Sequence, residues 1–136
     1  MIATVFSIAK KKEESNPFFD NHNTHKVVLL NPKISFVSDE TFTLYDDCFS
    51  LPWILVKVKR HSSISLQYQD ITGNTFKVEK LDKSLSELLQ HEIDHLEGIL
   101  CIDRALDSQS ILSRQVYNQF KSKWDSMVDY HIIPTL

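Results

Sequence analysis

The first part of the chain alternates short apolar runs with polar turn segments, a pattern typical of β-strands. Ile54, Val56 and Val58, for example, alternate with Lys57 and Lys59, as in a strand that is buried on one face. Residues 10–25 are mostly polar and contain Asn-Pro and Asp-Asn-His-Asn, which indicates a loop or a long hairpin connection. The expected strands cover residues 2–9, 27–31, 34–37, 41–45, 54–59, 64–69 and 75–78, and the last two form a hairpin.

A helical period replaces this alternation near residue 84. Ser84 followed by Glu87 fits a capping box at the start of a helix, and Gly98 fits its end. The predicted helix therefore covers about residues 84–97. The residues that would bury one face of it are Leu88, Leu89, Ile93, Leu96 and Ile99.

A second amphipathic pattern near the C-terminus predicts a long helix over residues 109–130. We interpret it as a packing helix and not as a ligand site. Its apolar stripe consists of Leu112, Val116, Phe120, Trp124, Met127 and Val128. Together the elements predict an α+β fold in which small mixed or antiparallel sheets wrap a central helix, with the C-terminal helix packed outside.

Length and composition fit one globular domain over residues 1–136, because 42% of the residues are apolar and only two are glycine. The formal net charge of −3 gives no general electrostatic reason to expect a nucleic acid or an anionic membrane as partner. Basic clusters at residues 10–12 and 57–61 are interpreted as solvated surface. The sequence leaves the oligomeric state open.

Location follows from what the sequence does not contain. No stretch approaches the roughly 20 apolar residues of a membrane span, and residues 1–9 are too short for a secretory signal, so we expect a cytoplasmic protein. Two cysteines do not make a disulfide framework. Cys101, within Ile-Leu-Cys-Ile, is expected to be a small buried apolar residue.

The most specific chemical pattern is His-Glu-x-x-His at residues 91–95. Residues four apart share one face of a helix, so His91 and His95 can direct ring nitrogens at one metal ion while Glu92 reaches a water bound to it. Two imidazoles leave a catalytic zinc or iron without its usual third protein ligand. Cys48, upstream in Asp-Asp-Cys-Phe-Ser, is the best candidate for that ligand.

The alternative is that these are two ordinary surface histidines, which is a common outcome for a histidine pair on a helix. The apolar stripe argues against it, because a buried helix must satisfy the polar groups of two histidines and a glutamate. One metal ion can satisfy these polar groups, which would otherwise need three unrelated hydrogen-bond partners. We therefore interpret the pattern as a metallohydrolase site.

Two segments also resemble a known family. Residues 90–104, Q-H-E-I-D-H-L-E-G-I-L-C-I-D-R, look like the third signature motif of peptide deformylases, and D-D-C-F-S-L-P at 46–52 resembles their second motif, usually E-G-C-L-S. The hairpin over residues 64–78 and the strand with Asn-Pro at 27–34 resemble the family's elements before the metal helix. The resemblance covers roughly residues 1–106.

Departures from the family pattern bear on activity. The family's first motif, G-x-G-x-A-A-x-Q, would precede residues 1–9, and its glutamine, which helps hold the formyl oxygen, has no counterpart here. Losing one such donor costs about 10²–10³ in rate, unless a start upstream of Met1 restores it. In the second motif Asp46 and Asp47 replace Glu and Gly, and Phe49 replaces Leu. Asp47 is the more serious change if that position needs a positive φ.

The resemblance implies a function and a mechanism. It implies hydrolysis of the N-formyl group on the initiator methionine of new polypeptides, and so a formyl-methionyl peptide substrate and contact with the ribosome near the exit tunnel. Cys48, His91 and His95 would hold the ion, Glu92 would transfer the proton, and the backbone N–H of Phe49 would polarise the formyl oxygen.

The same resemblance implies the cofactor and the substrate pocket. It favours Fe(II) as the single divalent ion, with Zn(II) or Ni(II) as alternatives. Leu88 and Ile64 are the expected walls of an apolar pocket for the methionine side chain.

Two alternatives to an active deformylase remain at this stage. The first is a deformylase-like paralogue that keeps its metal but hydrolyses formyl-methionine poorly or not at all. The second is a zincin-type endopeptidase, which takes its third ligand from a Glu or His further along the chain. That reading is weak, because Cys48 lies upstream and only Asp103 and Asp107 are carboxylates soon after Glu97.

Overall fold

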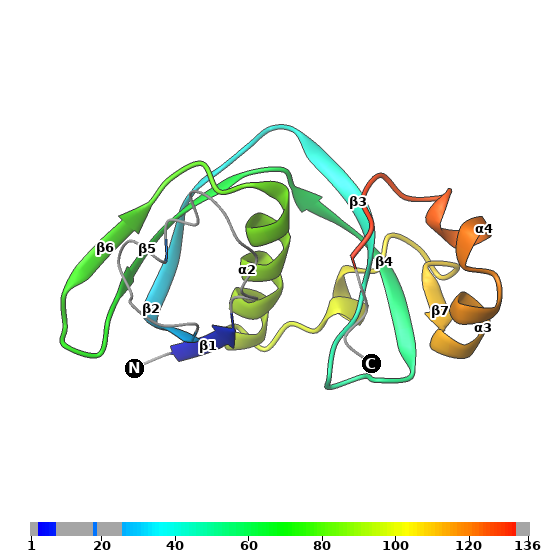
Figure 1. Ribbon diagram of the computed structural model, residues 1–136, viewed down its shortest axis with the longest axis horizontal. Helices are drawn as coiled ribbons and strands as arrows, with labels where there is room; N and C mark the ends of the chain where they lie inside the picture. The colour runs from blue at the N-terminus through cyan, green and yellow to red at the C-terminus, as the bar shows by residue number, and fades with distance from the viewer. Residues whose placement is uncertain (1–2, 8–17, 19–25, 133–136) are drawn as a thin grey trace.

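The computed structural model describes residues 3–7, 18 and 26–132 of the chain. Within these residues two antiparallel sheets account for all the strands (Figure 1). The four-stranded sheet has the order β1-β2-β5-β6, formed by Ala3–Ser7, Lys26–Val37, Ile64–Gln69 and Thr75–Val78. The three-stranded sheet has the order β3-β4-β7, formed by Thr41–Asp46, Ile54–His61 and Ile111–Ser113.

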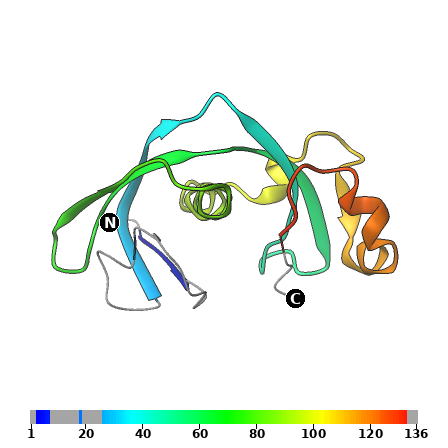
Figure 2. The same ribbon diagram turned by 45° about the horizontal axis from the view of Figure 1, so that its top comes forward.

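The two sheets are joined into an arch, with helix α2 (Lys83–Leu96) beneath it (Figure 2). The chain passes directly from one sheet to the other from β2 into β3 and from β4 into β5, and a third time from β6 through α2 into β7. The two direct crossings bring both sheets to the same helix. The arrangement confirms the predicted α+β fold with antiparallel sheets around the central helix. No helix in the described part of the chain has the length and apolar character of a membrane span.

Helix α2 begins earlier than the sequence pattern suggested. Its N-cap is Asp82, whose Oδ1 accepts the backbone N–H of Leu85 at 2.9 Å. The predicted capping box of Ser84 and Glu87 is therefore wrong, because an aspartate two residues earlier provides the side-chain acceptor. The predicted end is confirmed: Gly98 has a φ of 77° and donates its N–H to the His95 carbonyl at 3.1 Å.

Apolar packing holds α2 under the arch. Leu89 and Ile93 of the helix belong to a core cluster with side chains of the four-stranded sheet and Phe18. A second cluster surrounds Cys48 and Cys101 beneath the three-stranded sheet. The members of the first cluster are Phe18, Val27, Leu29, Ile64, Leu66, Tyr68, Val78, Leu81, Leu89 and Ile93. The helix is thus buried along one side, as its sequence stripe predicts.

Strand β2 is continuous where two strands were predicted. The break expected at Asn31 and Pro32 is a shift in register, between the pairs Leu30–Gln69 and Lys33–Gln67, inside one long strand. Asn31 takes a φ of 50°, a left-handed conformation that asparagine tolerates better than most residues. The turn-forming pair therefore bends the strand without ending it.

The C-terminal region also differs from the prediction of one helix over residues 109–130. Strand β7 pairs with the edge of β4, and two short helices follow, α3 (Arg114–Gln119) and α4 (Lys121–Asp125). They meet at Phe120, whose φ of −129° and ψ of 43° are not helical. The exposed edge of β4 provides backbone partners for residues 111–113, and this pairing outweighs the helical pattern.

Beyond α4 the chain returns to the second sheet. The N–H groups of Asp129 and Tyr130 both donate to the Thr43 carbonyl at 3.1 Å, and the Asp129 carboxylate accepts from the Thr43 N–H at 3.0 Å. Tyr130 and Ile132 pack against the cluster that contains Cys48. This segment therefore lies beside the loop that carries the candidate metal ligand.

Candidate metal centre

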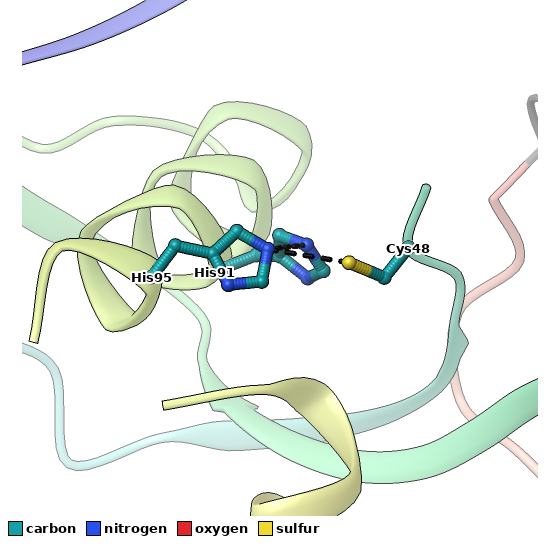
Figure 3. A group of neighbouring side chains, drawn as sticks. All are labelled: Cys48, His91 and His95. Atoms are coloured by element: carbon teal, nitrogen blue, oxygen red, sulfur yellow. Dashed lines mark hydrogen bonds between the residues drawn. The ribbon is translucent and has the colours of Figure 1, made fainter. Parts of the chain in front are cut away.

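The structure brings Cys48, His91 and His95 together (Figure 3). The two histidines lie one turn apart on α2, and Cys48 lies in the turn after β3. His95 Nε2 is 2.9 Å from His91 Nε2 and 3.3 Å from Cys48 Sγ, and the three ligand atoms all lie within 4.8 Å of one another. Tetrahedral coordination places such atoms about 3.3–3.6 Å apart, so the trio is close to the spacing that one ion needs.

Both histidines have their other ring nitrogen occupied. His91 Nδ1 donates to Asp46 Oδ2 at 2.8 Å, and His95 Nδ1 donates to the Ile99 carbonyl at 3.1 Å. A carbonyl only accepts, and Asp46 also accepts from Arg60, so both Nδ1 atoms carry the proton. The two Nε2 lone pairs then face each other and require a cation between them. A divalent ion with a thiolate and two imidazoles as ligands fits this arrangement.

Without a metal, a proton takes this place. Burial opposes a charged imidazole, but the hydrogen bond and the charge of Asp46 outweigh it and raise the pKa of His91 to about 9. The same carboxylate that orients the ring for a metal therefore also favours its protonation. Metal and proton compete for His91.

Arg60 joins the site to the rest of the helix. It is 4% exposed and donates from Nη2 to Asp46 at 2.9 Å and from Nη1 to Asp94 at 2.7 Å. Arg104 binds the same Asp94 through Nη2 at 2.9 Å. Burial alone would lower the pKa of Arg60, but the two carboxylates raise it. The network fixes β3, β4 and α2 relative to one another.

Sequence reasoning missed Arg60 because it lies in the basic cluster at residues 57–61, which was interpreted as solvated surface. The correct signal was present in the alternation. Val56, Val58 and Arg60 share one face of β4, and both valines are completely buried. An arginine on a buried face requires carboxylate partners.

Asp47 does not have a positive φ, although the corresponding family position is usually glycine. Among the described residues, only Asn31 and Lys80 have a positive φ without being glycine. The Asp47 carboxylate instead lies 3.4 Å from Arg114 Nη2, and Arg114 Nε donates to the Pro52 carbonyl at 2.7 Å. A residue from the C-terminal region thus helps to hold the cysteine loop.

A pocket of about 370 Å³ opens beside the trio. Glu92 and Leu88 line it from α2, and Phe49 lines it from the cysteine loop. Ile64, the other expected wall residue, is completely buried in the first core cluster and does not line the pocket. The remaining residues around the pocket are Asp46, Asp47, Cys48, Ser50, Glu87, His91, His95 and Ile132.

Two further titratable groups lie near the site. Glu87 is 9% exposed, and burial, followed by the negative charge of Asp46, raises its pKa to about 8. Cys101 is 3% exposed, and burial raises the pKa of its thiol to about 12. The burial expected of Cys101 is confirmed, and its thiol stays protonated, unlike that of a metal ligand.

Comparison with known proteins was consistent across sequence and structure. A sequence profile described as polypeptide deformylase matches residues 2–110 of this chain. The peptide deformylase of Synechococcus sp. (strain CC9902) is 36% identical over 104 residues, which are 76% of this chain and 51% of that protein. Peptide deformylase 1B, chloroplastic/mitochondrial, of Arabidopsis thaliana is 34% identical over 110 residues, 81% of this chain and 40% of that protein.

The fold agrees with these sequence matches. The crystal structure of peptide deformylase from Thermotoga maritima superposes with a TM-score of 0.58 and 35% identity, covering 60% of this chain and 55% of that chain. This chain spans about half the length of the curated relatives it matches. The matched residues contain the whole trio and Glu92, whereas β7, α3, α4 and the segment with Ile132 follow them.

Proposed function

Because the chain belongs to the polypeptide deformylase family, we propose that it is a metal-dependent hydrolase that removes the N-formyl group from the initiator methionine of nascent polypeptides. The observation that carries this proposal is the trio of Cys48, His91 and His95, with both Nε2 atoms facing the same point as Cys48 Sγ. Three protein ligands leave a fourth position open, as a catalytic site requires.

Each residue of the pocket has a separate role in this proposal. A divalent ion supplies Lewis acidity, which lowers the pKa of water and polarises a carbonyl oxygen. Cys48, His91 and His95 would hold the ion. Glu92, which lines the same pocket, accepts the proton of the attacking water and passes it to the leaving amine, so that the C–N bond breaks and formate and a free amine are formed.

Two other groups position the substrate. The backbone N–H of Phe49, a residue of the cysteine loop that lines the pocket, donates to the formyl oxygen as negative charge develops there. Leu88 contacts the side chain of the first residue of the substrate. We no longer assign Ile64 to this wall, because its side chain is enclosed by the core.

The identity of the metal is a separate part of the proposal. A thiolate with two imidazoles suits Fe(II), Zn(II) and Ni(II), and we propose Fe(II) on the family resemblance alone. Elemental analysis of protein purified without oxygen tests this. We expect one divalent ion per chain in the native protein and almost none in Cys48→Ala.

The activity of this polypeptide is proposed to be low. The only glycines among its 136 residues are Gly73 and Gly98, so they contain no G-x-G segment and no glutamine in that context. Without that donor, turnover should fall about 10²–10³-fold below that of a complete deformylase. A protein that binds metal without turnover is the second candidate, favoured by the same observation.

The endopeptidase alternative is not supported by the surroundings of the helix end. Asp103 Oδ2 accepts the N–H of Leu100 at 2.9 Å, and Asp107 Oδ1 accepts the N–H of Gln109 at 2.9 Å and the hydroxyl of Ser110 at 2.9 Å. Both carboxylates are therefore used in local turns. Cys48 remains the third ligand in the proposal.

Formate release by the iron-loaded protein from formyl-Met peptides tests the function. We expect slow release in the native protein and none in Glu92→Ala, which should still bind metal because Glu92 is a proton carrier and not a ligand. Glu97→Ala is the matched control, since Glu97 is an exposed carboxylate at the end of the same helix. Equal release by native protein and Glu92→Ala would refute the mechanism.

Location and partners follow the same reasoning. A Cys48 thiolate requires a reducing compartment, so the cytoplasm is the proposed location. The substrate proposed here emerges from the ribosome, and we accordingly propose action close to the exit tunnel. Sedimentation with ribosomes that carry nascent chains would test this partner.

A further inference from the structure

Glu87 is a carboxyl group of the pocket that the proposed mechanism does not use. It lies on α2 one turn before His91, and residues four apart lie on the same side of a helix. Its side chain is more than nine-tenths buried, yet it lines the pocket together with Leu88 and Glu92. The buried carboxyl therefore faces the space that the substrate would occupy.

The other buried carboxylates of this pocket have cationic partners. Asp46 binds Arg60 and His91, and Asp47 lies beside Arg114. Within the described part of the chain Glu87 makes no hydrogen bond and no ion pair, and the pocket lining contains no lysine or arginine. The Glu87 oxygens are not among the fully enclosed unpaired atoms of the described residues, so they are open to the pocket. A hydrogen-bond donor that enters there meets a carboxyl group with no competing protein partner.

The position of Glu87 relates it to the first side chain of a substrate. That side chain is attached to the carbon next to the amide nitrogen that hydrolysis releases. With the formyl group at the metal trio, the first side chain therefore lies in the same pocket. Leu88 and Ile132 offer apolar contacts for its stem. Glu87 lies on the helix beside Leu88, where it can meet the end of a long side chain.

We propose that Glu87 determines specificity: the pocket prefers N-formyl substrates whose first side chain ends in an N–H donor, best a primary amine on an alkyl stem, over purely apolar side chains. This preference rests on the proposed function, because it assumes that the formyl group lies at the metal trio. Formyl-methionine is accepted in this pocket but leaves the Glu87 carboxyl without a donor.

Binding of two peptide hydroxamates to the metal-loaded protein tests the proposal without any turnover. The hydroxamate group chelates the metal, and the two probes differ only in the first side chain, n-butyl in one and 4-aminobutyl in the other. Isothermal titration calorimetry at pH 7 gives both dissociation constants. We expect the native protein to bind the 4-aminobutyl probe about tenfold more tightly, the gain from one hydrogen bond to a charged group.

Three variants define the role of Glu87. Glu87→Leu should reverse the preference towards the n-butyl probe. Glu87→Gln, which keeps an acceptor but has no proton to lose when the charged amine enters, should leave a small preference for the amine. Glu97→Gln removes an exposed carboxylate of the same helix end and should keep the native ratio. If Glu87→Leu does not fold, Glu87→Gln alone still tests the proposal, since an unchanged ratio contradicts it.

The outcomes separate this proposal from the proposed function. A native ratio near one, the same ratio in Glu87→Leu, or no binding of either probe to protein with metal bound would overturn it. Formate release from the matching formyl peptides is measured in parallel. If the binding ratio is as expected and no formate appears, the hydrolase function fails while the side-chain preference stands. If formate is released but the two probes bind equally well, the side-chain preference fails while the hydrolase function stands.

Discussion

Asp46 is the residue on which the chemistry of the candidate site depends most directly. One of its oxygens, Oδ2, accepts both from His91 Nδ1 at 2.8 Å and from Arg60 Nη2 at 2.9 Å. The histidine is thereby oriented with its Nε2 towards Cys48 and His95, and the carboxylate keeps its charge because a buried arginine compensates it. A single side chain thus sets both the geometry and the basicity of a candidate metal ligand.

Replacing Asp46 by Asn keeps its size but removes the charge that polarises His91. We expect the affinity for a divalent ion to fall about 10–100-fold, as is usual when the partner of a metal-bound histidine is removed. Competition with a chelator at pH 7 measures this affinity. Asp39→Asn, at an exposed position, is the control and should bind like the native protein. An affinity within a factor of two of native would show that Asp46 does not act on the metal.

Metal binding should depend on pH through His91. The pKa of its imidazole is raised from 6.5 to about 9 in the metal-free protein, so the protonated ring stabilises the metal-free fold below about pH 6.5, and this contribution is lost as the pH rises through 9. Metal binding must displace the same proton, and affinity should therefore increase with pH up to about 9.

Calorimetry in two buffers with different ionisation enthalpies counts the protons released. At pH 7 we expect the native protein to release more protons per ion than Asp46→Asn, in which the pKa of His91 is no longer raised. Equal release by both proteins would contradict this assignment.

At the scale of elements, α2 carries the site because three different contacts hold it. Leu89 and Ile93 bury it against the four-stranded sheet, Asp82 caps its start, and Asp94 links it through Arg60 to β3 and β4. The helix is thus fixed to the strand that precedes Cys48. These contacts therefore hold Cys48 at a fixed distance from His91 and His95.

Loss of Arg60 should be far more damaging than loss of a neighbouring basic residue. Arg60→Ala leaves the buried carboxylates of Asp46 and Asp94 without their shared partner, and we expect the free energy of unfolding to fall by about 3–5 kcal/mol. Lys59→Ala, on the exposed face of β4, should change it by less than about 0.5 kcal/mol. Urea unfolding of the metal-free proteins measures both. A loss below about 1 kcal/mol in Arg60→Ala would show that the network contributes little.

At the scale of the whole molecule, the site lies where the two sheets converge on one helix. Cys48 belongs to the three-stranded sheet through β3, whereas the histidines belong to the helix that also packs on the four-stranded sheet. Ile132, beyond the matched family region, lines the same pocket. A bound ion would therefore join parts of the fold that lie far apart in the sequence.

Removing the metal should consequently destabilise the whole fold. With free metal at about 100 times its dissociation constant, binding stabilises the native state by about 2.7 kcal/mol, and a chelator should lower the melting temperature accordingly. Cys48→Ala is the matched control and should melt at the same temperature with and without the chelator. Identical melting of the native protein in both conditions would argue against the ion as a link between the two parts.

The sequence by itself determined the features that depend on local order. The 3.6-residue period placed His91, Glu92 and His95 on one helix, Gly98 marked its end, and alternation predicted the hairpin of β5 and β6, since each of these signals lies within a few neighbouring residues. Cys48 lies far from the histidines in the sequence, so no local period links them. Its role as a ligand was predicted from the chemistry of the ligand set and from the family motif.

Only the tertiary structure decided the rest. Arg60 belongs to a basic run in the sequence, and only packing under the arch shows that it binds two buried carboxylates. The strand at residues 111–113 forms because the edge of β4 is exposed there, against a helical pattern. Glu87 fits the exposed side of a helix cap in the sequence, but the fold buries it in the pocket wall. In each case the partner lies far away in the chain, and local periodicity carries no information about it.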